Sequence, residues 1–260
     1  MRHDPLELAQ TNALFQLRRG LVTIQQGKET GDTLASLSVA YRVLALCALL
    51  READPNRFTE LLCKAGQVRL HLLERATTGV QVSPRAMAAS NDVGFLSSLA
   101  AGDLPTARRI AALSPVTPTP GWEDEEDFVF FHCLHRMVHP VPEEAGLRQV
   151  LMRWRRLEAD SPSPFLQVCE SLLENESTRF HASFTQMLDA RQTLMREYRK
   201  QLDFDRELYA TEGKVYINGL AILRLAESRG LPGREHDVLI PRLALLSSFK
   251  PLPEHAWREP

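Results

Sequence analysis

Cysteine is scarce in this chain of 260 residues, and no two cysteines lie close together in the sequence. The four are Cys47, Cys63, Cys133 and Cys169. A CxxC metal or redox site needs closely spaced cysteines, so this spacing argues against one. Each cysteine falls within an apolar helical pattern. We therefore expect four buried free thiols, which suits a reducing compartment.

Short motifs of catalysis and nucleotide binding are missing as well. The patterns GxSxG, GxGxxG, HEXXH and the P-loop do not occur in the chain. Their absence argues against the enzymes and nucleotide-binding proteins that these motifs mark. Catalytic side chains can also converge from distant segments, so an enzyme is disfavoured without being excluded. We predict a protein that is not an enzyme and that needs no cofactor.

A long hydrophobic run and a strong net charge are both absent. The most apolar run, Val43 to Leu50, is far too short to cross a bilayer. The first ten residues contain no apolar segment typical of a signal peptide. With a net charge of −2, the chain as a whole attracts neither nucleic acid nor an anionic membrane. We expect a cytoplasmic protein without nucleic-acid or membrane partners.

Helical periodicity, by contrast, runs along nearly the whole chain. Aliphatic residues recur at spacings of three and four, and no stretch shows a convincing strand-like alternation. Asp4-Pro5, Asp54-Pro55 and Ser83-Pro84 each place a capping residue before a proline, which is typical of helix starts. Asp32 or Thr33 is the expected cap of the second helix. We predict an all-α fold of about ten helices, an irregular bundle or an array of antiparallel helix pairs, with no significant sheet.

Proline-rich breaks separate the predicted helices. The breaks at 114–121 and 160–164 are possible subdomain seams, but the helices on both sides need partners for their apolar faces. We therefore predict one domain over residues 1–260. The later helices are expected at 123–138, 143–159, 165–173, 178–198, 214–229 and 238–247, and the tail after Phe249 is expected to be irregular.

A Gly-Asp corner lies at the centre of the stretch from Asn91 to Phe131. Gly102 suits the left-handed conformation that ends a helix, and Asp103 can cap the next one. Small residues on both sides would let the two helices approach closely; they are Ala100, Ala101, Ala107, Ala111 and Ala112. This pattern predicts an antiparallel helix pair, although no repeat with a fixed period follows it.

Five consecutive acids follow this pair, immediately after Trp122. They are Glu123, Asp124, Glu125, Glu126 and Asp127. Residues 121–144 contain seven acidic residues and one basic residue, a net charge of −6. Acids favour a helix N-terminus and are often just a solvated face, and Trp122 can pack as a staple on the helix that it precedes. The alternative is a docking surface in which Trp122 anchors a basic partner that the acids attract.

Three histidines, His132, His135 and His139, would lie on one face of the same helix. Such spacing can supply metal ligands, and acids one turn earlier could add oxygen donors. No second pair of ligands is visible elsewhere, and the neighbouring apolar residues are more typical of histidines at the edge of a core. Histidines near acids can also make an interface sensitive to pH.

Two basic segments with interleaved aromatic residues could bind phosphate groups. They are Arg153-Trp154-Arg155-Arg156 and the segment from Arg196 to Lys200. Acids such as Glu158, Asp160 and Glu197 lie beside them, so we expect helix faces with internal ion pairs.

Two stretches together resemble the bacterial immunity protein 49 family. The first is FLSSLAAGDLPTARRIAAL from Phe95 to Leu113, followed by WEDEEDFVFF. The second is NGLAILRLAESRGL from Asn218 to Leu231, followed by apolar residues and Pro241. Members of that family neutralise polymorphic or secreted toxins in the producing cell or its siblings. The resemblance implies a cytoplasmic, all-helical, non-enzymatic inhibitor that binds one cognate toxin.

The resemblance carries over no inhibitory residue, so the candidate docking site is the segment from Trp122 to Asp127. The toxin would then have a basic surface, such as the substrate groove of a nuclease. Two other functions stay open. One is a helical adaptor that binds a protein in a concave groove, and the other is an all-α enzyme or metal protein that uses the histidine face.

Overall fold

The computed structural model describes residues 4–141, 143–158, 161–234, 237–246 and 248–259. Throughout these ranges the fold is all-α, with no β-strand, as predicted. The α-helices and the two short 3-10 helices are α1 (Pro5–Gln25), α2 (Gly31–Arg51), α3 (Pro55–Thr77), α4 (Pro84–Met87), η1 (Ala89–Asn91), α5 (Val93–Ala101), α6 (Leu104–Leu113), α7 (Glu125–Met137), α8 (Glu144–Leu157), α9 (Pro164–Glu174), α10 (Ser177–Tyr198), α11 (Arg206–Ala210), α12 (Ile217–Ser228), α13 (Arg242–Leu245) and η2 (Ala256–Arg258).

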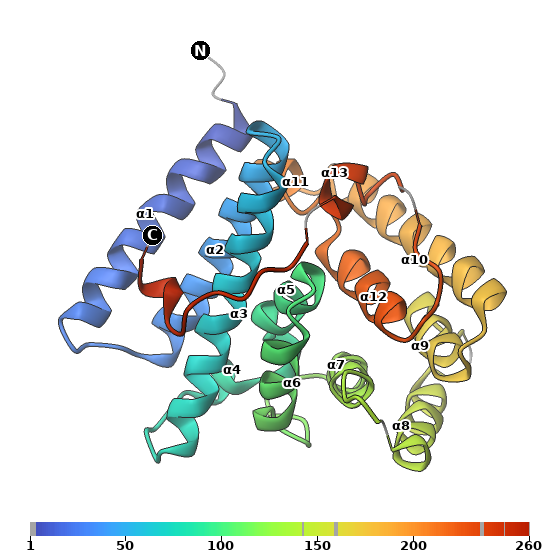
Figure 1. The fold of residues 1–260 in the computed structure, drawn as a ribbon. Coiled ribbons are helices and arrows are strands. Elements are labelled where there is room, and N and C mark those ends of the chain that lie inside the picture. The colour runs from blue at the N-terminus through green and yellow to red at the C-terminus, as the bar shows by residue number, and fades with distance from the viewer. Residues whose placement is uncertain (1–3, 142, 159–160, 235–236, 247, 260) are drawn as a thin grey trace.

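The helices form a layered array in which α3 and α5 lie near the middle. Helices α1, α2 and α3 pack side by side at one end, α5 packs against α3, and α12 packs against α5 (Figure 1). Helices α7 to α10 continue the array on the other side (Figure 1). The last residues return across α3, where η2 packs (Figure 1). Helices α3 and α5 therefore lie between α1 and α7 (Figure 1).

Most of the predicted helix starts are confirmed. Asp4, Asp54, Ser83 and Asp103 each accept a backbone N–H from the first turn of their helix, because their side chains satisfy donors that the helix leaves free. The prediction for the second helix was wrong. Thr30 caps α2 by accepting the N–H of Thr33 at 3.1 Å, since the helix already begins at Gly31.

Three predicted helices are shorter in the structure. The helix predicted at 123–138 begins at Glu125. The helix predicted at 214–229 begins at Ile217, because the N–H of Tyr216 bonds to the carbonyl of Leu239 instead of continuing a helical turn. The helix predicted at 238–247 covers only Arg242–Leu245. Residues 159, 160 and 247, which belong to predicted helices or to the second seam, lie outside the described ranges.

Helices α3 and α5 approach closely at two glycines. A Cβ added to Gly66 of α3 would lie 1.9 Å from Ser98 Oγ, and one added to Gly94 of α5 would lie 2.3 Å from Arg69 Cβ. The corner between α5 and α6 is as expected, with Gly102 at φ 79°. Glycine is required there because a side chain is strained in the left-handed region.

One hydrophobic cluster extends from Ala13 to Trp257 and includes residues on both sides of each predicted seam. All four cysteines are buried and free, as predicted. Helix α2 is long and apolar enough to cross a membrane by length and composition. The shorter run from Val43 to Leu50 had not indicated this. Within the fold, however, 67% of that span is buried, as in the core helix of a soluble protein. The single domain stays a prediction.

Candidate functional site

The acidic segment divides into residues that the fold uses and residues that it leaves free. Glu123 belongs to the first group. Its two carboxylate oxygens accept the backbone N–H groups of Ser90 and Thr119, each at 2.7 Å. Partial burial opposes the charge, but these donors hold the pKa of Glu123 below its ordinary value. Glu123 therefore ties the loop before α7 to η1, and it is not an available docking residue.

Glu125, in the first turn of α7, is also engaged. It lies 2.7 Å from Arg153 Nε of α8, and both side chains are about half exposed. Such an exposed pair contributes about 0 to 1 kcal/mol of stability because water screens it. A partner could therefore displace it at little cost.

The remaining acids, Asp124, Glu126 and Asp127, are exposed. Among the described residues, no side chain or backbone donor is bonded to any of their carboxylates. Trp122 lies beside them with 53% of its surface exposed, so it does not pack as a buried staple. We call Trp122, Asp124, Glu126 and Asp127 the acidic patch. Phe128, fully buried directly after it, fixes the start of α7 to the core.

The three histidines do share one cavity, of about 420 Å³, together with Arg136 and Glu143. His132 accepts a hydrogen bond from Arg136 Nε at 3.2 Å and stacks on the ring of Phe128. Burial, with a further contribution from the positive charge of Arg136, lowers the pKa of His132 to about 4, so this ring is neutral at physiological pH.

His135 lies at the buried end of that cavity. Its Nε2 is 3.7 Å from Asp92 Oδ2. Its ring contacts the ring of Phe95 edge-on, with the two ring centroids 4.4 Å apart. His139 follows the helix and is exposed. Within the part of the chain that the structure describes, no group of three His, Cys, Asp or Glu side chains could hold a metal ion. The spacing thus places the histidines on one face, but two of them contact other side chains of this chain. His132 contacts Arg136, and His135 contacts Asp92.

A buried charge network links these histidines to the middle of the fold, and it was not predicted. Arg69 of α3 lies 3.2 Å from Asp92, and His135 of α7 approaches the same carboxylate. All three side chains are at least 95% buried. The only sequence signal for it was a charged residue, Arg69, within the apolar face of α3, and that face also contains Lys64. The network positions α7, and with it the acidic patch, relative to α3 and α5.

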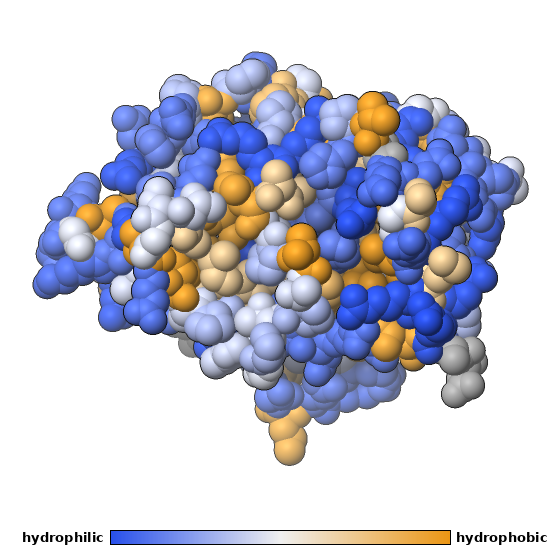
Figure 2. Space-filling view, turned by 90° about the horizontal axis from the view of Figure 1, so that it is seen from below, coloured by the Kyte–Doolittle hydropathy of each residue, from blue (hydrophilic) through white to orange (hydrophobic). Residues whose placement is uncertain are grey.

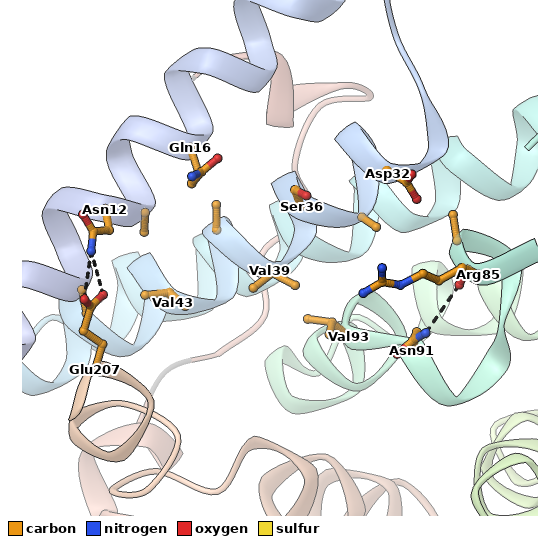
Figure 3. Close-up of a pocket in the computed structure, with 15 residues that line it drawn as sticks. Asn12, Gln16, Asp32, Ser36, Val39, Val43, Arg85, Asn91, Val93 and Glu207 are labelled. Carbon is orange, nitrogen blue, oxygen red and sulfur yellow. Dashed lines mark hydrogen bonds between the residues drawn. The ribbon is translucent and has the colours of Figure 1, made fainter. Parts of the chain in front are cut away.

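A surface groove of about 660 Å³ was also missed by sequence reasoning. It lies between α1, α2 and the α4–α5 segment, and Glu207 of α11 closes one end by accepting two bonds from Asn12 (Figure 3). Small apolar side chains line its floor, and one of them, Val39, is 47% exposed. The walls come from four distant segments, so no local pattern could have indicated it.

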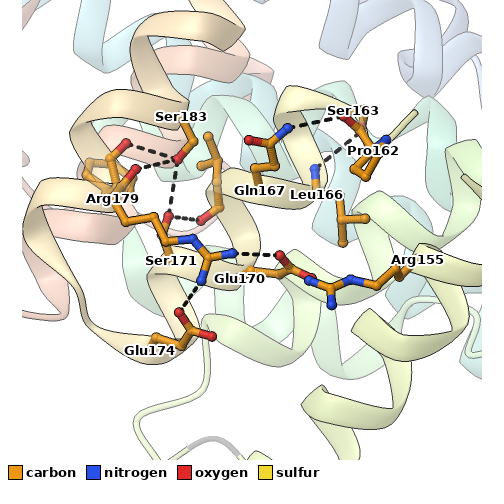
Figure 4. Close-up of polar contacts among 12 residues, drawn as sticks. Arg155, Pro162, Ser163, Leu166, Gln167, Glu170, Ser171, Glu174, Arg179 and Ser183 are labelled. Atoms are coloured by element: carbon orange, nitrogen blue, oxygen red, sulfur yellow. Dashed lines mark hydrogen bonds and ion pairs between the residues drawn. The ribbon is translucent and has the colours of Figure 1, made fainter. Parts of the chain in front are cut away.

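Among the described residues, three of the six basic side chains in the two basic segments pair with acids, so the expectation of ion-paired faces holds in part. Arg153 pairs with Glu125, and Arg155 pairs with the mostly buried Glu170 of α9, which also binds Arg179 at 3.1 Å (Figure 4). Trp154 is buried and donates to Glu158. In the second segment Lys200 pairs with Glu197. These contacts favour structural ion pairs over a phosphate site.

Comparison of this chain with protein-family models, with curated proteins and with solved structures finds no match. The arrangement of the side chains therefore carries the functional argument.

Proposed function

We propose that this chain is an immunity-type inhibitor that binds a cognate toxin protein in the cytoplasm through the acidic patch. The observation that carries the proposal is the unequal use of the five acids. The fold takes up Glu123 and Glu125, whereas Asp124, Glu126 and Asp127 stay free beside an exposed tryptophan. The helical fold and the resemblance to immunity protein 49 support it further.

The chemistry of the patch suits a basic partner. An exposed tryptophan supplies a large apolar contact at the centre of many protein interfaces. Three free carboxylates on one helix end attract positive charge, which raises the association rate and favours basic partners over neutral ones. The partner would be a toxin with a basic groove, such as an enzyme that acts on nucleic acid. The inhibitor itself needs no catalytic group.

The patch is held in place before it binds. Glu123 fixes the loop on one side, and the buried Phe128 fixes the helix on the other. Little conformational entropy would then be lost on binding, which favours a tight complex.

The test is co-expression with the product of the adjacent gene, followed by measurement of growth and affinity. Replacing Asp124, Glu126 and Asp127 with lysine should abolish rescue and weaken binding by about a hundredfold or more. A matched control places the same three lysines at Asp189, Asp203 and Glu254, which are exposed acids elsewhere. Equal affinity of both triple variants for the toxin, at low and moderate salt, would show that the acidic patch is not part of the interface.

A helical adaptor is the second candidate, and the groove beside α1 and α2 favours it. Its apolar floor and polar rim resemble sites that accept a helix or an extended peptide. Figure 2 shows several separate hydrophobic patches on one face of the molecule, so exposed apolar side chains are not confined to this groove. If the chain is an adaptor, Val39→Glu should abolish partner binding and the three lysine substitutions in the acidic patch should leave it unchanged. If the chain is an immunity protein, the lysine substitutions should abolish binding and Val39→Glu should leave it unchanged.

A further inference from the structure

The outward face of α1 carries a line of large apolar side chains. Leu8, Phe15 and Val22 are 43%, 61% and 50% exposed. They are spaced by seven residues, about two helical turns, so they lie on one stripe. The opposite face of the helix is already packed in the core through Ala9, Ala13, Leu17, Leu21 and Ile24. We call Leu8, Phe15 and Val22 the α1 seam. It is not part of the helix's own packing.

The charges beside the seam are divided between the two halves of the helix. Glu7 lies near the N-terminal end, and Arg18 and Arg19 lie in the C-terminal half. All three are exposed, and none forms an ion pair with another described residue. A second α1 helix in antiparallel orientation would place its basic half against the acidic end of the first. In parallel orientation, like charges would face each other.

We propose that two copies of this chain associate through α1, antiparallel, about a two-fold axis at Phe15. This register pairs Leu8 of each copy with Val22 of the other and Phe15 with Phe15, so every seam side chain is covered. A two-fold interface must be complementary to itself, and both the spacing and the charge pattern of α1 meet that condition.

The position of α1 allows this contact. It forms one edge of the array, and α7 lies on the other side of α3 and α5 (Figure 1). Self-association and partner binding through the patch would therefore not compete. Helix α1 is about 31 Å long, and one helix face buries less than the roughly 800 Å² per partner of a standard interface. We therefore expect a weak dimer, populated at high protein concentration.

Sedimentation equilibrium from micromolar to near-millimolar concentration tests the proposal. The wild-type chain should show a reversible monomer–dimer equilibrium, and Phe15→Glu should weaken it by about tenfold or more. The matched control is Met152→Glu, which changes an apolar side chain of similar exposure on α8, at the other side of the array, and should leave the equilibrium unchanged (Figure 1). A wild-type chain that stays monomeric throughout the range would overturn the proposal, and so would equal effects of the two variants.

Orientation is tested separately. Arg18→Glu should weaken the dimer, and Glu7→Arg in the same chain should restore it, because the swap preserves antiparallel complementarity. Leu8→Cys and Val22→Cys chains should form a disulfide with each other under mild oxidation, and neither should do so alone. The native cysteines are buried and do not interfere. Self-crosslinking of Leu8→Cys alone would show a parallel arrangement and contradict the register.

Discussion

Arg69 Nε lies 3.2 Å from Asp92 Oδ1, and both side chains are buried between α3 and α5. Arg69 also donates to the backbone carbonyls of Ala86, Met87 and Ala88. Burial opposes the charge of Asp92, yet Arg69 and His135 hold the pKa of this carboxyl below its ordinary value. The pair therefore joins α3, the α4–η1 segment and α5 in one place.

Replacing Asp92 with asparagine should lower the free energy of unfolding by about 3 to 5 kcal/mol, because it leaves Arg69 as an uncompensated buried charge. Chemical denaturation measures the change. Asp103→Asn is the control, since Asp103 is a buried cap of the next helix that accepts the N–H of Thr106 without a cationic partner. Asparagine caps nearly as well, so this control should lose little. Similar losses in both variants would show that the ion pair is not the source.

Gly66→Ala should destabilise the protein by about 1 to 3 kcal/mol, because α3 and α5 touch at this point and the added methyl overlaps Ser98 Oγ. Ser98→Ala alone should be nearly neutral, since this buried hydroxyl has no hydrogen-bond partner among the described residues. Adding Ser98→Ala to Gly66→Ala should recover part of the loss. Thermal unfolding of the four proteins in this cycle measures the coupling, and strict additivity would contradict the steric explanation.

His132 should make stability depend on pH in mildly acidic solution. Its folded pKa is about 4, whereas an unfolded histidine titrates near about 6.5. Unfolding therefore takes up a proton between these values, and stability falls as the pH drops from about 6.5 towards 4. His132→Gln keeps an acceptor for Arg136 but does not titrate. The unfolding free energy of this variant should fall less steeply than that of the wild type over this pH window. Equal slopes for the two proteins would contradict the prediction.

Trp257 should be as important to stability as a core residue of a helix. It is fully buried, its carbonyl accepts the hydroxyl of Tyr41, and Lys64 binds the backbone at Glu259. Trp257→Ala should cost about 3 to 5 kcal/mol. Trp122→Ala is the matched control and should change stability by no more than about 0.5 kcal/mol, because that side chain is half exposed. The two losses are compared by urea denaturation.

The sequence by itself determined the all-α class, the buried thiols and most helix starts. Periodicity and capping are local properties, so Asp54 before Pro55 specifies a helix start wherever the helix packs. Where local signals compete, they mislead. Thr30 caps α2 ahead of Asp32, and the bond from Tyr216 to Leu239 shortens the start of α12. The bond from Tyr216 depends on Leu239, more than twenty residues away in the sequence.

The acidic run shows most clearly what only the tertiary structure decided. Five consecutive acids look equivalent in the sequence, but Ser90 and Thr119 take up Glu123, Arg153 takes up Glu125, and three acids stay free. The histidine spacing correctly placed three rings on one face, whereas the buried Asp92 decided what His135 contacts. Such partners come from segments distant in the chain. Which charge is neutralised and which stays available therefore depends on packing, and no local pattern records it.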